Sequence, residues 1–90
     1  MTNSKFNIFI NKKTISVNDR AFNYGDGLFE TILVKNNKII YLKEHVERLH
    51  KGCDIICINK PTFSLIRKNA EIAIGNRKNC VLKIILSRGS

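Results

Sequence analysis

The sequence predicts an α+β domain in which two helices pack on one face of a mostly antiparallel sheet. Short β-rich runs separated by turn signals occupy the first half of the chain, two stretches with helical periodicity follow, and a strongly apolar run comes last. The expected order is therefore four strands, two helices and a final strand. A chain of 90 residues buries roughly 60–65% of its unfolded surface, which is enough for a single modest core.

The chain is expected to open with a hairpin followed by a long irregular stretch. Phe6–Ile10 alternates loosely, and residues 14–17 resume extended character after a polar turn. Residues 18–24 fit neither a period of 2 nor one of 3.6, and irregular segments held by rigid elements often carry function. Gly25 and Gly27 follow, where glycine permits backbone conformations that other residues resist.

A second hairpin is expected directly after these glycines. Leu28–Lys35 is rich in β-branched and apolar residues, which favours a strand. Asn36 and Asn37 suit a two-residue turn because asparagine tolerates positive φ. The return strand is then expected over Lys38–Leu42.

Two helices and a last strand complete the predicted fold. The first helix begins near Lys43, and its apolar residues recur at spacings of three and four: Leu42, Val46, Leu49, Cys53 and Ile56. Gly52 weakens this helix by about 1 kcal/mol relative to alanine, which suggests a packing reason for it. Pro61 breaks the first helix, and the second is expected over Thr62–Ile74 with this apolar stripe: Phe63, Ile66, Ala70 and Ala73. Val81–Ser87 is the final strand.

Composition restricts the class of protein. No apolar run approaches the ~20 residues that span a bilayer, and the N-terminus has no secretory signal pattern, so we expect a cytoplasmic protein away from membranes. Cys53, Cys57 and Cys80 are expected to be buried reduced thiols without a metal. The formal charge of +9 keeps open a small basic domain that binds nucleic acid or a partner. The lysines are scattered, however, and form no basic stripe with interleaved aromatic residues.

The run Asn18–Thr31 is the most distinctive part of the chain. It reads Asn-Asp-Arg-Ala-Phe-Asn-Tyr-Gly-Asp-Gly-Leu-Phe-Glu-Thr, and by spacing alone its glycines predict only a structural turn before a strand. Together with Leu42–Leu49 and Val81–Ser90, which follow in order, it resembles the class IV aminotransferases, most closely their aminodeoxychorismate lyases. The resemblance covers almost the whole chain and implies the small N-terminal domain of a pyridoxal-phosphate enzyme.

The resemblance also implies roles for single residues. Arg48 matches the helix arginine that binds the phosphate of pyridoxal phosphate, and the alternative is a solvated arginine paired with Glu44. The other matched residues are expected on the substrate side of the site: Tyr24, Phe29 and Arg88. Phe29 could equally be a core aromatic, and His45 is expected to be structural. No lysine here matches the family's catalytic lysine, so no catalytic residue is expected in this chain.

We therefore expect residues 1–90 to be the N-terminal part of an aminodeoxychorismate lyase that is inactive without its C-terminal domain. The complete enzyme would convert 4-amino-4-deoxychorismate to 4-aminobenzoate and pyruvate in folate biosynthesis. Family members are usually dimers, so a homodimer acting on a small anionic substrate is expected. The alternatives are part of a D-amino-acid or branched-chain aminotransferase, or the basic non-enzymatic domain.

Overall fold

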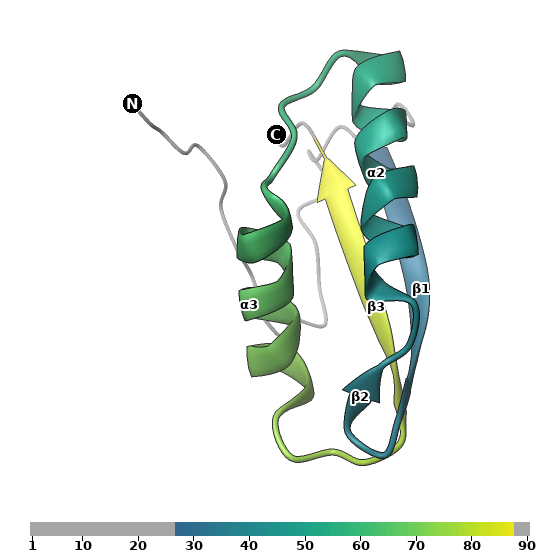
Figure 1. Ribbon diagram of the computed structural model, residues 1–90. Coiled ribbons are helices and arrows are strands. Elements are labelled where there is room, and N and C mark those ends of the chain that lie inside the picture. Colours follow the sequence, from purple (N-terminus) through teal and green to yellow (C-terminus); the bar gives the residue numbers. More distant parts are fainter. Residues whose placement is uncertain (1–26, 88–90) are drawn as a thin grey trace, which may run out of the picture.

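The computed structural model describes residues 27–87, which form a three-stranded sheet and two helices (Figure 1). The elements are β1 (Gly27–Lys35), β2 (Lys38–Ile39), α2 (Leu42–Ile56), α3 (Phe63–Ile74) and β3 (Cys80–Ser87). Both strand pairings are antiparallel, and the strand order is β2-β1-β3. The predicted α+β class is confirmed, whereas the hairpin expected over residues 6–17 lies outside the described residues.

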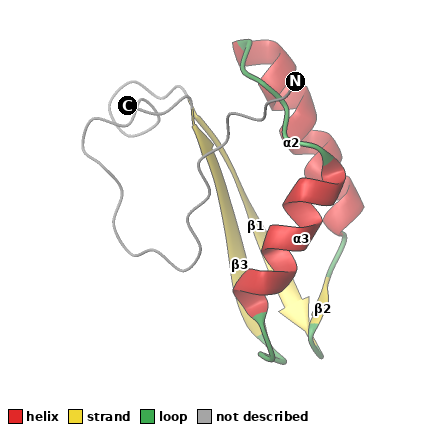
Figure 2. Cartoon of the chain, turned by 90° about the vertical axis from the view of Figure 1, so that its left-hand side faces the viewer, coloured by secondary structure: helices red, strands yellow, loops and turns green. Residues whose placement is uncertain are grey.

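The central strand β1 carries the core on one of its two faces. Alternate residues of β1 point to the same side, and Ile32 and Val34 on that side have no exposed surface. Figure 2 shows α2 and α3 together on one side of β1 and β3, so both helices cover the same face. β3 contributes the buried Leu82, and the helices contribute the other buried apolar side chains of the core: Val46, Leu49, Cys53, Ile66, Ala70 and Ile74. The opposite face of the sheet leaves Phe29 and Leu33 exposed.

The turn between β1 and β2 is tied to the far end of the chain. Asn36 and Asn37 both adopt positive φ, as the sequence predicted. The Asn37 side-chain amide donates to the backbone oxygens of Gly75, at 3.0 Å, and Arg77, at 2.7 Å. Its backbone N–H donates to the Lys78 oxygen at 2.8 Å. One asparagine therefore joins the hairpin turn to the loop between α3 and β3.

Strand β2 is shorter than the sequence predicted. It covers only Lys38–Ile39, whereas extended character was expected up to Leu42. Tyr41 adopts the left-handed conformation, with φ 58° and ψ 37°, and this turns the chain directly into α2. The helix therefore begins at Leu42.

The end of α2 also differs from the prediction. The helix ends at Ile56, before the expected break at Pro61, because Cys57 adopts φ 59° and its N–H bonds to the Cys53 oxygen. At this position Cys57 is exposed, and Cys80 of β3 is only partly buried, so the expectation of three buried thiols holds for Cys53 alone. The linker that follows is held by His50, whose Nε2 lies 2.6 Å from the Pro61 oxygen.

Helix α3 begins where the sequence predicted. The Thr62 hydroxyl accepts a hydrogen bond from the Leu65 N–H at 3.1 Å, which is an N-cap interaction. The apolar stripe differs in two positions, since Ile74 is buried and Phe63 is 38% exposed. Continuing the helical spacing from Ile66 and Ala70 leads to Ile74, whereas Phe63 is the first residue of the helix.

Gly52 of α2 has the packing reason that its sequence context suggested. A Cβ at this position would lie 2.6 Å from Leu28 Cδ2. We therefore expect Gly52→Ala to lower the free energy of unfolding by about 1–2 kcal/mol, because overpacking outweighs the gain in helix propensity. In a Leu28→Ala background, the same substitution should stabilise the domain by about 1 kcal/mol. Urea unfolding of the four proteins measures both effects, and a stabilising Gly52→Ala with Leu28 present would contradict this explanation.

Candidate functional site

Glu30 is the only buried charged residue among residues 27–87. It follows the alternation of β1 and points to the same side as Ile32 and Val34, where it is 8% exposed. A carboxylate taken out of water is costly unless charged or hydrogen-bonding partners replace the water. Two residues of α2, Arg48 and His45, supply those partners.

Arg48 holds Glu30 in a two-point interaction. Its Nε donates to Glu30 Oε2 at 3.0 Å and its Nη2 donates to Oε1 at 2.8 Å. Paired hydrogen bonds of this kind join a planar guanidinium to a planar carboxylate and fix the orientation of both. The partner of Arg48 is therefore a residue of β1 and not Glu44, one turn earlier on the helix, which was the alternative from sequence.

His45 completes the cluster from the same side of α2. Its position three residues before Arg48 places the two side chains next to each other on the helix. His45 Nδ1 lies 2.6 Å from Glu30 Oε1, the same oxygen that accepts from Arg48 Nη2. The expectation that His45 is structural agrees with this contact, and the contact also places it within 3.3 Å of Arg48 Nη2.

The protonation states of this cluster follow from its hydrogen bonds. The Arg48 hydrogen bonds lower the pKa of Glu30 below its ordinary value, against the opposing effect of burial, and His45 lowers it further. The same contact raises the pKa of Arg48. Because Glu30 is then an ionised acceptor, Nδ1 of His45 carries a proton and donates it to the carboxylate.

Arg48 keeps an accessible side. Its side chain is 69% exposed, although Glu30 beneath it is buried. Among residues 27–87, its Nη1 has no hydrogen-bond partner, so this nitrogen and the outer surface of the guanidinium face solvent. A guanidinium held from below by a carboxylate and open from above can bind an anion such as phosphate. The residues present therefore fit the phosphate group that the sequence resemblance assigned to Arg48.

Phe29 stands next to Glu30 in β1 but on the opposite face of the sheet. It is 69% exposed, and its cross-strand neighbour on β3 is Ile85, which is 51% exposed. Phe29 is therefore no core aromatic of the described region. It lies on the other face of the sheet from the Glu30 side chain, and its role toward substrate stays a prediction. The other two predicted substrate residues, Tyr24 and Arg88, lie outside the described residues.

Glu30 is the site residue that the sequence analysis missed. Its signal was present, because a charged residue at position 30 breaks the inward alternation that continues with Ile32 and Val34. A charge on the buried side of a strand requires a partner. Arg48 could have been proposed as that partner only if the position and rotation of α2 on β1 had been known.

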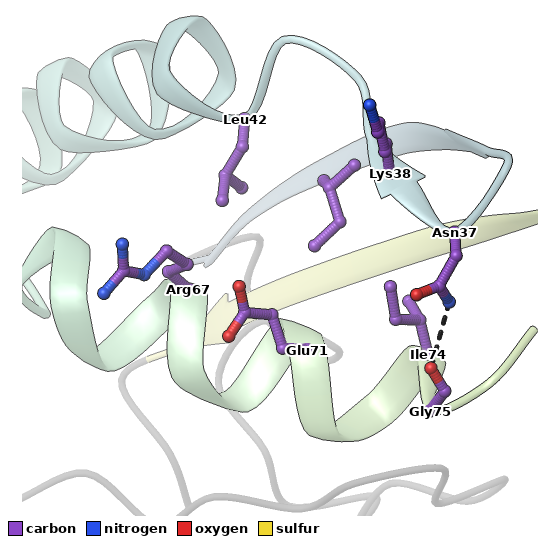
Figure 3. A pocket seen from close by; sticks show the side chains of 8 residues that line it. Asn37, Lys38, Leu42, Arg67, Glu71, Ile74 and Gly75 are labelled. Carbon is purple, nitrogen blue, oxygen red and sulfur yellow. Dashed lines mark hydrogen bonds between the residues drawn. The ribbon is translucent and has the colours of Figure 1, made fainter.

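A surface hollow of the described region lies elsewhere. It has a volume of about 430 Å³ and lies between β2, the start of α2 and α3 (Figure 3). Figure 3 shows Leu42 and Glu71 lining it, with the Asn37 to Gly75 hydrogen bond at its edge. It contains neither Glu30 nor Arg48, so we place the candidate site at the charged cluster. Among the described residues, no group of three or more His, Cys, Asp or Glu side chains could hold a metal ion.

The chain belongs to the class IV aminotransferase family, whose family model, described as amino-transferase class IV, matches residues 27–90. The D-alanine aminotransferase of Bacillus licheniformis is 36% identical over 79 residues, covering 83% of this chain and 28% of the relative. The crystal structure of 4-amino-4-deoxychorismate lyase from Pseudomonas aeruginosa matches with a TM-score of 0.78 and 33% identity. The match covers 88% of this chain and 29% of the lyase chain.

A third comparison concerns the cofactor. A hypothetical aminotransferase from Mycobacterium tuberculosis, solved in a pyridoxal-phosphate-bound form, has a TM-score of 0.76 and 26% identity. The match covers 91% of this chain and 31% of that one. The chain thus spans about three tenths of the length of these relatives. In the described part of the chain, neither helix is long and apolar enough to cross a membrane.

Proposed function

We propose that this chain is the N-terminal domain of a pyridoxal-phosphate-dependent lyase, and that Arg48 binds the phosphate of the cofactor. The carrying observation is the two-point contact of Arg48 with buried Glu30, which leaves the outer side of the guanidinium exposed. The relatives include both a lyase and aminotransferases. The Gly25-Asp26-Gly27 sequence favours the lyase, which would act on 4-amino-4-deoxychorismate.

In this proposal the described residues bind and orient. Arg48 supplies charge-assisted donors to the phosphate, and Glu30 restricts the guanidinium to one orientation. His45 contacts the same Glu30 Oε1 that accepts from Arg48, and so helps to hold the carboxylate in place beneath the guanidinium. Pyridoxal phosphate, when bound, supplies an electron sink for the reacting carbon, and the protein positions it. The covalent chemistry would be carried out by a lysine that lies outside these 90 residues.

The substrate side of the proposed site involves three further residues. Phe29 presents an exposed ring at the start of β1, where an aromatic surface can pack against a substrate ring. Tyr24 would line the same pocket, and Arg88 would bind a substrate carboxylate. The high positive charge of the chain suits an anionic small molecule. We further propose that the complete enzyme is a cytoplasmic homodimer. The 90-residue chain by itself is expected to release no pyruvate from 4-amino-4-deoxychorismate.

Replacement of Arg48 tests the phosphate role. Arg48→Ala should weaken binding of inorganic phosphate and of pyridoxal phosphate by about tenfold or more, because charge-assisted hydrogen bonds are lost. The binding is measured by NMR titration of the chain. Arg67→Ala is the matched control, since Arg67 is an exposed arginine on α3 whose guanidinium lies 6.0 Å from the Phe63 ring. Equal phosphate affinity in wild type and Arg48→Ala would refute the assignment.

A further inference from the structure

The guanidinium of Arg48 has two edges that can each donate a pair of parallel hydrogen bonds. The inner edge consists of Nε–H and one N–H of Nη2, and the outer edge consists of the other N–H of Nη2 and one N–H of Nη1. Glu30 occupies the inner edge, because Nε donates to Oε2 at 3.0 Å and Nη2 donates to Oε1 at 2.8 Å. The outer edge is left for a ligand, since no residue in the range 27–87 accepts a hydrogen bond from Nη1.

The direction of the outer edge is fixed by what holds the inner one. The Glu30 side chain is 9% exposed on the helix-facing side of β1, whereas the Arg48 side chain is 69% exposed. His45 Nδ1 contacts the same Oε1 at 2.6 Å, so the carboxylate has a second anchor on α2. All five N–H bonds of a guanidinium lie in one plane. Fixing the inner edge on a buried carboxylate therefore also fixes where the outer edge points.

An anion from solvent accordingly meets Arg48 at the outer edge. To reach Nε it would have to displace Glu30, and this would leave a buried carboxylate without its charged donor. The outer edge requires no such exchange, and its two parallel N–H bonds suit two oxygens of one anion. Phosphate and its monoesters present such a pair of oxygens. Chloride is a single atom and cannot accept both bonds in good alignment.

We propose that Glu30 is a positioning residue that makes Arg48 selective for oxyanions, because it takes up the inner edge and presents the outer edge to the phosphate. The inference rests on the proposed phosphate role of Arg48 and adds the origin of its selectivity. Glu30 has two opposing effects on that site. Its negative charge weakens the attraction of Arg48 for every anion, whereas its hydrogen bonds orient the guanidinium for anions that offer two oxygens.

The use of the outer edge is tested by adding inorganic phosphate to the 90-residue chain and following the Arg48 side chain by NMR. The Nη signals should shift with phosphate concentration. The Nε–H signal should keep its position, because Glu30 still accepts from it. A shift of Nε–H as large as those of the Nη groups would mean that phosphate replaces Glu30 on the inner edge, and this would overturn the inference.

The selectivity is tested by the ratio of phosphate affinity to chloride affinity. Glu30→Gln keeps the size of the side chain but offers only one accepting oxygen, so the paired contact with the inner edge is lost. The ratio should then fall about threefold to tenfold, because the outer edge is no longer held in place. Removing a negative charge would by itself raise the ratio, since phosphate carries more charge than chloride. A fall in the ratio therefore reports lost orientation.

Glu44→Gln is the matched control for the change in charge. Glu44 is an exposed acid one turn before Arg48 on α2, and the ion pair that the structure shows for Arg48 is with Glu30. Its replacement removes the same charge from the same helix and leaves the inner edge occupied. The ratio of phosphate to chloride affinity in Glu44→Gln should equal that of wild type or exceed it slightly.

Arg48→Lys is a second variant that does not depend on the stability of Glu30→Gln. Lysine keeps the positive charge but has no planar pair of edges, so the ratio should fall in this variant as well. A ratio like that of wild type in folded Glu30→Gln or in Arg48→Lys would overturn the inference and leave Arg48 as the phosphate ligand. Phosphate binding that is undiminished in Arg48→Ala would overturn the proposed phosphate role itself.

Discussion

Replacing Ile32 with alanine is expected to lower the free energy of unfolding by about 2–5 kcal/mol. Ile32 has no exposed surface and packs at the centre of β1 beneath the two helices. The alanine leaves a cavity that the neighbouring side chains fill only in part. Small domains are stable by about 5–15 kcal/mol in total, so this single change removes a large share of the stability. Urea unfolding followed by circular dichroism measures the loss.

The neighbouring residue provides the control for this prediction. Leu33 is 55% exposed on the opposite face of β1, so Leu33→Ala should cost less than about 1 kcal/mol. The two substitutions remove the same number of carbon atoms from adjacent positions and differ mainly in burial. A loss for Leu33→Ala as large as that for Ile32→Ala would mean that the outer face of the sheet is covered in solution.

The second large effect is expected at Glu30. Glu30→Gln should lower the free energy of unfolding by about 1–2 kcal/mol at pH 7, because Arg48 and His45 lose an ionised acceptor. Solvent around the exposed side of Arg48 keeps the effect at the lower end for a charged pair. Glutamine preserves the size of the side chain, so packing changes little. Glu71→Gln on the exposed surface of α3 is the control and should be nearly neutral.

The pH dependence of this loss has a definite sign. The pKa of Glu30 is lower in the folded protein than its ordinary value, chiefly through the Arg48 hydrogen bonds. The stability that Glu30 contributes is therefore fully present above the unfolded value of about 4.3. It is lost as the pH falls through the folded value. Wild type and Glu30→Gln should converge in stability in acid, and a difference that persists or grows there would contradict the assigned ionisation.

Much of the fold was predictable from local patterns. The strands β1 and β3, the turn at Asn36 and the cap at Thr62 follow from β-rich runs, asparagine and a threonine before a helix. The errors lie where the backbone conformation of a single residue determines the end of a strand or a helix. Tyr41 and Cys57 adopt positive φ, which side chains other than glycine and asparagine seldom do. No feature of the sequence marks these two positions, so the end of β2 and the end of α2 were misjudged.

The candidate site was predictable only in part. Arg48 was identified by the resemblance of its motif to a family, and the structure adds the buried carboxylate that holds it. Glu30 lies 18 residues away in sequence, and their contact depends on how α2 is rotated over the sheet. Local periodicity contains no information on that rotation. Long-range pairs of this kind become visible only when strand register and helix packing are known together.

The hydrogen bonds of the Asn36 and Asn37 turn bear on how the domain assembles. They join it to Asn79, 43 residues away, and to the loop around Gly75 and Arg77. The pairing of β1 with β3 begins beside this junction, at Val34 and Cys80. The chain must therefore lose the entropy of closing a long loop before its main ladder gains any hydrogen bond. Topologies with such non-local pairing fold more slowly than helical bundles, so we expect closure of this loop to slow the folding of the domain.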